Sequence, residues 1–163
     1  NRIGVIATKA TIASDDYPRK ILEKNPALHV FSKATPAFVP LIEEGIIDNQ
    51  IMDLTIHYYL DDFLAENQID TLVLGCTHYP LLRSTMRRLM GEDVTLVNPA
   101  YETAIELRGL LAENGLSRDP FAPFAGEKHQ FFVSDLAEKF TDFASSILPE
   151  DVTETKKINI EEY

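Results

Sequence analysis

The only cysteine of the chain, Cys76, stands in a short segment whose residue types could carry acid and base chemistry. It is followed by a hydroxyl and an imidazole, Thr77 and His78, and then by Tyr79 and Pro80. A thiol beside a protonated histidine or at a helix N-terminus has a lowered pKa, and its thiolate is the reactive form. The segment therefore predicts a reactive thiol. The competing interpretation is that Cys76 is a small buried apolar residue and His78 a structural histidine.

The elements on either side of Cys76 decide where this thiol lies. The apolar, β-branched run at residues 71–75 is typical of a buried parallel strand, and Pro80 opens a helix that continues to Met90. Residues 76–79 are then the turn between strand and helix. Open α/β sheets bind ligands beyond the carboxyl ends of their strands, so Cys76 is predicted at a binding edge.

Two further loops are expected at the same edge, after strands at residues 3–6 and 28–32. The first loop offers the hydroxyls of Thr8 and Thr11, which could hold a carboxylate or phosphate, or could merely cap the next helix. The second loop leads through an apolar stretch to Glu43 and Glu44. A carboxylate there could orient a histidine or tune a thiol, whereas a solvated helix end is the alternative, more strongly for Glu44.

Strand and helix patterns alternate along the rest of the chain, which predicts an α/β fold with a mostly parallel sheet flanked by helices on both faces. Asn98 and Pro99 form a cap and first turn for a helix that ends near Gly115. Other expected elements are a helix at 15–24 capped by Ser14, a strand at 94–97, a strand at 130–133 and a helix after Ser134. The longest helix is expected at 50–66, with an apolar side made by Ile51, Leu54, Tyr58, Leu60 and Leu64.

Composition narrows the class of partner. The 163 residues carry a formal net charge of −11, which argues against nucleic acid and anionic membranes and favours a small-molecule substrate. One cysteine excludes an internal disulfide framework, and no apolar run has the length of a membrane span, so a cytoplasmic setting is expected. His29, His57 and His129 are scattered, so no metal site is predicted.

Four segments together resemble the second half of glutamate racemase: residues 8–12, 38–45, 75–80 and 97–100. Their order and spacing agree with that family from the first residue to about Leu148. The string Gly-Cys-Thr-His-Tyr-Pro at 75–80 separates it from the aspartate and hydantoin racemases, which share the fold. The resemblance implies the aspartate/glutamate racemase fold, each half of which is flavodoxin-like.

The resemblance also implies an activity. Glutamate racemases interconvert L- and D-glutamate without a cofactor, for peptidoglycan synthesis, and two cysteines exchange the α-proton from opposite faces. Carried over by motif, Cys76 would be one acid and base, His78 would assist it and Glu43 would tune this pair. The substrate's polar groups would be held by three hydroxyls, those of Thr77, Thr8 and Thr11.

The chain departs from the family in having no second cysteine and no counterpart of the family's first half. We therefore expect a fragment that is inactive alone and has the missing N-terminal half as its partner, with homodimer formation left open. Residues 1–98 are expected to form an autonomous domain, and 149–163 to be a flexible tail. In the family the segment 99–148 packs back on the first domain, so in this chain we expect the residues after 98 to be displaced, swapped with another copy or packed as a partial surrogate. A smaller departure is Thr35, where many relatives carry cysteine, and little effect on mechanism is expected from it.

Three other functions remain open from the residues alone. A non-catalytic α/β ligand-binding module would tolerate replacement of Cys76 by serine. A cysteine hydrolase would form a covalent acyl intermediate on this thiol. Another cysteine-dependent amino-acid racemase would share the mechanism but not the substrate.

Overall fold

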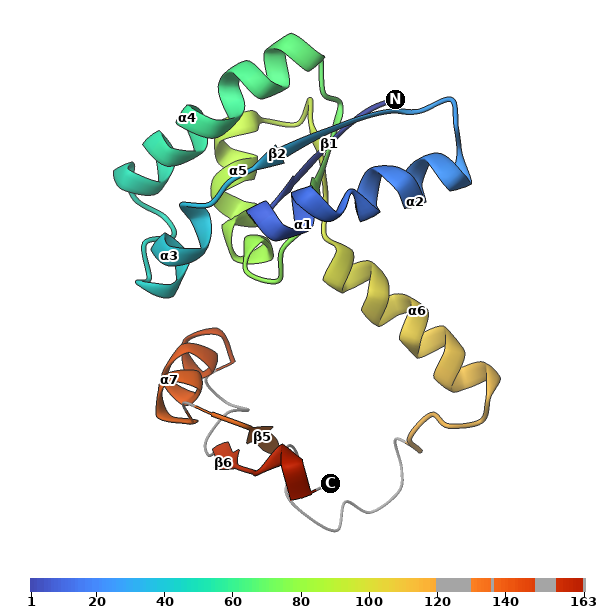
Figure 1. Cartoon of the computed structure of the whole chain (residues 1–163), viewed down its shortest axis with the longest axis vertical. Coiled ribbons are helices and arrows are strands. Elements are labelled where there is room, and N and C mark those ends of the chain that lie inside the picture. The colour runs from blue at the N-terminus through green and yellow to red at the C-terminus, as the bar shows by residue number, and fades with distance from the viewer. Residues whose placement is uncertain (120–129, 136, 149–154, 163) are drawn as a thin grey trace. The chain divides into compact units, whose positions relative to one another are not determined.

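The computed structural model describes residues 1–119, 130–135, 137–148 and 155–162, which fall into two compact units, Asn1–Leu116 and Ser117–Tyr163. The first unit alternates strands and helices as the sequence predicts (Figure 1). Its elements in chain order are β1 (Arg2–Ala7), α1 (Lys9–Ser14), α2 (Asp16–Lys24), β2 (His29–Ala34), α3 (Phe38–Glu43), α4 (Gln50–Asn67), β3 (Thr71–Leu74), the 3-10 helix η1 (Tyr79–Leu82), α5 (Arg83–Met90), β4 (Thr95–Val97) and α6 (Pro99–Glu113).

The sheet of the first unit is parallel throughout, with strand order β2-β1-β3-β4. The chain moves from β1 outward to β2 and then returns across β1 to β3. Right-handed connections on these opposite paths place α1 and α2 on one face of the sheet and α4 and α5 on the other (Figure 1). The predicted α/β class with helices on both faces is confirmed.

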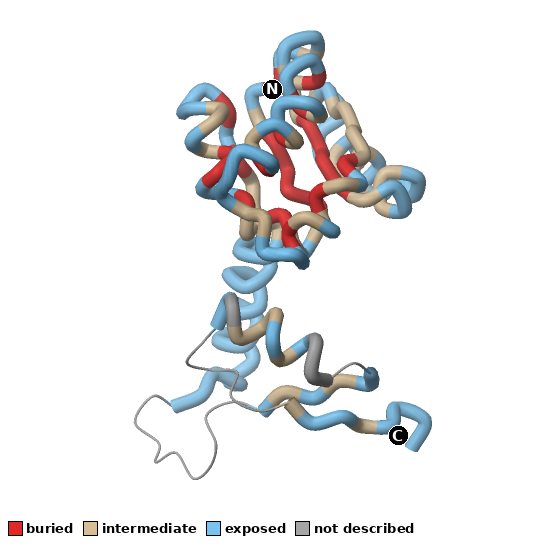
Figure 2. Tube along the Cα trace, turned by 90° about the vertical axis from the view of Figure 1, so that its left-hand side faces the viewer, coloured by how far each residue is buried: buried red, intermediate tan, exposed pale blue. Residues whose placement is uncertain are grey.

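The core lies between the strands and the helices that cover them (Figure 2). Both central strands are buried toward their carboxyl ends, which suits a sheet covered on two faces. The fully buried residues of β1 and β3 are Val5, Ile6, Ala7, Leu72 and Leu74. The loops that follow these two strands therefore begin at the buried end of the sheet.

The apolar side predicted for the longest helix is wrong. Ile51, Leu54 and Tyr58 are exposed, Tyr58 by 82%, whereas the buried residues of α4 are Met52, Ile56, Leu60 and Phe63. This helix carries apolar residues around much of its circumference, so its sequence allows two overlapping stripes. Packing against the sheet and α5 selects one of them, and only Leu60 belongs to both.

The start of the first helical segment also differs from the prediction. Residues 9–14 form a helix of their own, α1, and the chain then turns through Asp15 in a left-handed conformation with φ 55° before α2 begins. Ser14 is the last residue of α1 and not the cap of a helix. The cap of α1 is Thr8, whose side chain accepts a hydrogen bond from the Thr11 backbone N–H.

The second unit contains β5 (Phe131–Val133), α7 (Ala137–Ile147), β6 (Thr155–Lys157) and the 3-10 helix η2 (Ile160–Glu162). Its two strands pair in parallel. The segment 149–163 was expected to be a flexible tail, but Thr155–Lys157 form β6, while 149–154 and 163 lie outside the described residues. Strand pairing needs only backbone groups, so the polar side chains of this segment do not prevent it.

The boundary between the units differs from the one expected at residue 98. Helix α6 accounts for the difference, because it is grouped with the first unit. The predicted cap is confirmed, since the Asn98 side chain accepts hydrogen bonds from the N–H groups of Ala100 and Tyr101. None of the residues of α6 is buried. That residues 1–98 fold without this helix stays a prediction. Within the described residues, no helix has the length and apolar character needed to cross a membrane.

Candidate active site

Three loops meet at the carboxyl edge of the sheet because their strands are parallel and in register. The pairing aligns Ile6 of β1 with Leu74 of β3, and Ala7 with Ala34 of β2. Backbone hydrogen bonds continue one residue past the strands. The Gly75 N–H donates to the Ile6 carbonyl at 2.8 Å, and the Thr35 N–H donates to the Ala7 carbonyl at 3.0 Å. The expectation that these loops open on one edge is confirmed.

The strand order also marks where a ligand would bind at this edge. The chain leaves β1 toward β2 on one side, and β3 lies on the other side. The loops after β1 and β3 therefore diverge to opposite faces, and ligands of open α/β sheets bind at such a switch point. Thr8 and Cys76 stand in these two loops.

A thiol, an imidazole and a carboxylate line up at the loop after β3. The Cys76 Sγ lies 4.0 Å from Nδ1 of His78, and Nε2 of the same ring lies 3.3 Å from Oε1 of Glu43. His78 is 23% exposed and Glu43 42% exposed, so the line is open to solvent at its carboxylate end. The structure thus brings together the three predicted catalytic residues, Glu43 from the end of α3 and the other two from the turn.

In this arrangement a proton can pass in either direction between the imidazole and its two neighbours, the thiol and the carboxylate. Either nitrogen of a histidine ring can donate or accept a proton, so His78 can serve the thiol through Nδ1 and the carboxylate through Nε2. The Thr77 hydroxyl also lies 3.4 Å from Nδ1 of His78 and can share that nitrogen. Cys76 is partly exposed, so a substrate can reach it.

The predicted threonines are placed differently from one another. The hydroxyls of Thr8 and Thr11 lie 3.1 Å apart, and Thr8 caps α1. Of the two alternatives drawn from the sequence, the capping role is therefore present in the structure. Both hydroxyls stand at the switch point beside the thiol loop, and Thr77 adds a third hydroxyl within that loop.

Gly75 allows the thiol loop to approach the first strand. A Cβ at this position would lie 3.0 Å from the Ile6 carbonyl oxygen, 3.1 Å from Cε2 of Tyr17 and 3.3 Å from the Ala7 Cβ. Two of these three neighbours are backbone or a β-carbon, which cannot rotate away. Glycine is therefore needed for the position that Cys76 takes.

Two tyrosines, Tyr17 and Tyr79, lie at the thiol loop, and no functional role was predicted for either from the sequence. Burial raises the pKa of Tyr17, and the nearby charge of Cys76 adds to this effect. Burial raises the pKa of Tyr79 to about 12, with a smaller opposing effect from its hydrogen bond to Thr35. The signal that could have found Tyr79 is its place directly after His78.

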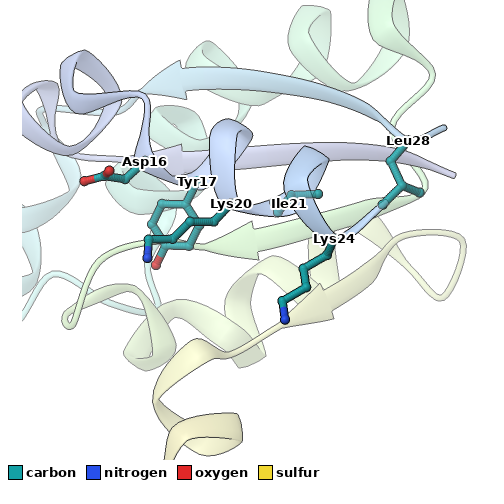
Figure 3. A pocket seen from close by; sticks show the side chains of 6 residues that line it. All are labelled: Asp16, Tyr17, Lys20, Ile21, Lys24 and Leu28. Carbon is teal, nitrogen blue, oxygen red and sulfur yellow. The ribbon is translucent and has the colours of Figure 1, made fainter. Parts of the chain in front are cut away.

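Tyr17 also lines a cavity of about 470 Å³ along α2 (Figure 3). Lys20, Ile21 and Lys24 from the same helix line it as well, together with Leu28 after the helix and Asp16 at its start. None of the six predicted site residues lines this cavity. Within the part of the chain that the structure describes, no group of three or more His, Cys, Asp or Glu side chains could hold a metal ion.

Comparison with known proteins decides between the candidate families. No protein-family model matches the chain. Glutamate racemases from Thermoanaerobacter sp. (strain X514) and Chlorobaculum parvum are 41% and 44% identical to it over 164 and 141 residues, covering 99% and 86% of this chain. The chain is a homologue of glutamate racemases.

Solved structures of glutamate racemases agree with this assignment over the described fold. The enzyme of Francisella tularensis in complex with D-glutamate has a TM-score of 0.86 at 33% identity and covers 100% of this chain. The RacE1 isoform of Bacillus anthracis has a TM-score of 0.85 at 35% identity and covers 98%. The chain therefore has the aspartate/glutamate racemase fold.

The homology covers only part of the relatives. The chain spans 60% and 50% of the length of the two curated relatives, and 59% and 57% of the two solved chains. The predicted resemblance to a C-terminal portion of glutamate racemase fits this coverage.

Proposed function

We propose that this chain carries one half of a glutamate racemase site, in which Cys76 exchanges the α-proton on one face of the substrate. The observation that carries the proposal is the line of Cys76, His78 and Glu43 at the switch point of the sheet. As thiolate, Cys76 takes the proton from one enantiomer and becomes a thiol. For the other enantiomer, the thiol returns a proton to the carbanion.

The substrate's charge must be held while the proton leaves. The α-carboxylate takes up negative charge in the carbanion, so hydrogen bonds to it stabilise the transition state more than the ground state. We assign this role to the hydroxyls of Thr8, Thr11 and Thr77. The capping of α1 by Thr8 does not conflict with it, because a hydroxyl oxygen has two lone pairs and a rotatable proton.

A second base must act on the opposite face, and this chain holds a single cysteine. The proposal assigns that base to the part of the relatives that the chain does not span, as in the family's two-thiol mechanism. Helix α6 supports such a partner, because it exposes a set of apolar side chains that a second segment could cover. These side chains are Tyr101, Ile105, Leu107, Leu110 and Leu111.

The remaining parts of the proposal follow from the family. The whole protein would act on L- and D-glutamate without a cofactor, in the cytoplasm, and supply D-glutamate for peptidoglycan. A homodimer is compatible with it, since α4 exposes Ile51, Leu54 and Tyr58. The F. tularensis structure contains D-glutamate, which supports the choice of substrate for a homologue.

The test is α-proton exchange of L- and D-glutamate in deuterated water, followed by loss of the α-proton NMR signal. The chain is assayed alone and together with the separately produced segment of the Thermoanaerobacter relative that it does not span. Exchange of both enantiomers is expected only in the mixture, and Cys76→Ala should reduce it to background. His57→Asn is the matched control, because His57 pairs with Asp61 on the exposed side of α4.

The other outcomes would contradict the proposal in different ways. Exchange by the chain alone would place the opposing base within these residues and end the half-site assignment. No exchange in a mixture that binds glutamate would favour a binding module, and unchanged binding by Cys76→Ser would strengthen that result.

A further inference from the structure

Two of the three loops at the candidate site are joined by a buried pair of hydroxyl groups. The Tyr79 hydroxyl lies 2.7 Å from Oγ1 of Thr35 and donates to the Thr35 carbonyl at 3.1 Å. A phenol has one proton to donate, so the Thr35 hydroxyl donates in return. Both residues are fully buried. Removal of either partner would leave a buried polar group without its hydrogen bond, which lowers the stability of the folded chain. The pair therefore fixes the distance between the two loops.

Tyr79 also contacts the beginning of the helix that carries the carboxylate. Its ring meets the ring of Phe38 edge to face, with centroids 5.4 Å apart and an interplanar angle of 71°. Phe38 is the first residue of α3 and is fully buried, and Glu43 is the last residue of the same helix. Because α3 is short and continuous, the position of its first turn sets the position of Glu43.

The backbone of Tyr79 belongs to the thiol turn. Its N–H donates to the Cys76 carbonyl at 3.1 Å, which closes the turn around Thr77 and His78. Tyr79 therefore touches the turn by its backbone and the approach to α3 by its side chain. Among the described residues, its hydroxyl bonds to Thr35 and not to the Cys76 thiol or the Glu43 carboxylate.

We propose that Tyr79 is a positioning residue, whose buried bond to Thr35 and contact with Phe38 hold Glu43 opposite His78. The inference rests on the proposed roles of Glu43 and His78 and adds the group that sets their spacing. It also gives Thr35 a part in the site, as the partner of this bond, although the sequence predicted little effect from that position.

The test uses Cys76 itself, because the chain has no other cysteine to react. The rate of alkylation by iodoacetamide is followed by mass spectrometry between pH 5 and 10, without glutamate. In Tyr79→Phe we expect the rate at pH 7 to fall by about tenfold, as in Glu43→Gln, because Glu43 then no longer lies opposite His78 and the ring beside the thiol loses this hydrogen-bond partner. Thr95→Val, at an exposed position in β4, is the control for the loss of a hydroxyl group and should keep the original profile.

A double variant separates positioning from general loosening. If Tyr79 acts through Glu43, Tyr79→Phe combined with Glu43→Gln should react no more slowly than Glu43→Gln alone. Thr35→Val, which keeps the Thr35 carbonyl as an acceptor for Tyr79, should lower the rate less than Tyr79→Phe does, and Thr35→Ser, which keeps the hydroxyl, should retain the original profile. Circular dichroism establishes that each variant is folded.

Two results would overturn the inference: a folded Tyr79→Phe with the original pH profile, or rate losses that multiply in the double variant. The assay contains no substrate, so its result is independent of whether the racemase proposal succeeds. If no racemisation is found but the alkylation rates change as expected, the racemase proposal is rejected and the positioning role of Tyr79 is kept.

Discussion

The burial of Tyr79 makes a quantitative prediction about stability in alkaline solution. Its pKa lies at about 12 instead of 10, mainly because the phenolate would lose its hydration in the core. Below pH 10 the full contribution of the protonated phenol to stability is present. Between pH 10 and 12 the unfolded chain releases this proton and the folded chain keeps it, so the free energy of unfolding falls as the pH rises through this window.

The size of the effect follows from the two pKa values. A rise from 10 to about 12 corresponds to about 2.7 kcal/mol of stability lost once the pH has passed the upper value. The change is read by urea unfolding at a series of pH values from 9 to 12, in the original chain and in Tyr79→Phe. The phenylalanine variant starts from a lower stability, because it leaves the buried Thr35 groups short of a partner.

The measured quantity is the difference between the two pH dependences, in which Tyr17, lysines and other shared groups cancel. We expect the original chain to lose about 2 to 3 kcal/mol more than Tyr79→Phe over this range. Tyr58→Phe is the control, because Tyr58 is 82% exposed, and it should follow the original chain. Parallel curves for the original chain and Tyr79→Phe would refute the reasoning that this phenol is buried and protonated.

Three further predictions concern other parts of the first unit. Gly75→Ala should cost about 1 to 3 kcal/mol in urea unfolding, because its Cβ would lie 3.0 Å from the Ile6 carbonyl oxygen; stability equal to that of the original chain would contradict it. Leu60→Ala should cost about 2 to 5 kcal/mol and Leu54→Ala about 0.5 kcal/mol or less, since only Leu60 is buried; equal losses in thermal unfolding would restore the apolar side predicted from sequence. Asn98→Ala should destabilise α6 by about 1 kcal/mol, seen as lower helicity by circular dichroism, unless the cap is not formed in solution.

The sequence determined the class of fold and the edge at which the site lies. Alternation of strands and helices is a local pattern, and parallel pairing then brings the carboxyl ends of the strands together without any knowledge of side-chain packing. For this reason the placement of Cys76, His78 and Glu43 could be predicted, and the structure brings these three residues into one line. The roles assigned to them remain predictions.

Only the tertiary structure decided which side of α4 is buried and what fixes the thiol turn. Apolar residues around much of the helix allow two overlapping stripes, and the choice between them depends on the sheet and α5. The bond from Tyr79 to Thr35 joins residues 44 positions apart, a distance at which no local pattern signals a contact. The spacing of apolar residues shows which residues share a face of one helix or strand. It does not show which faces of two distant elements pack together, and these features depend on that packing.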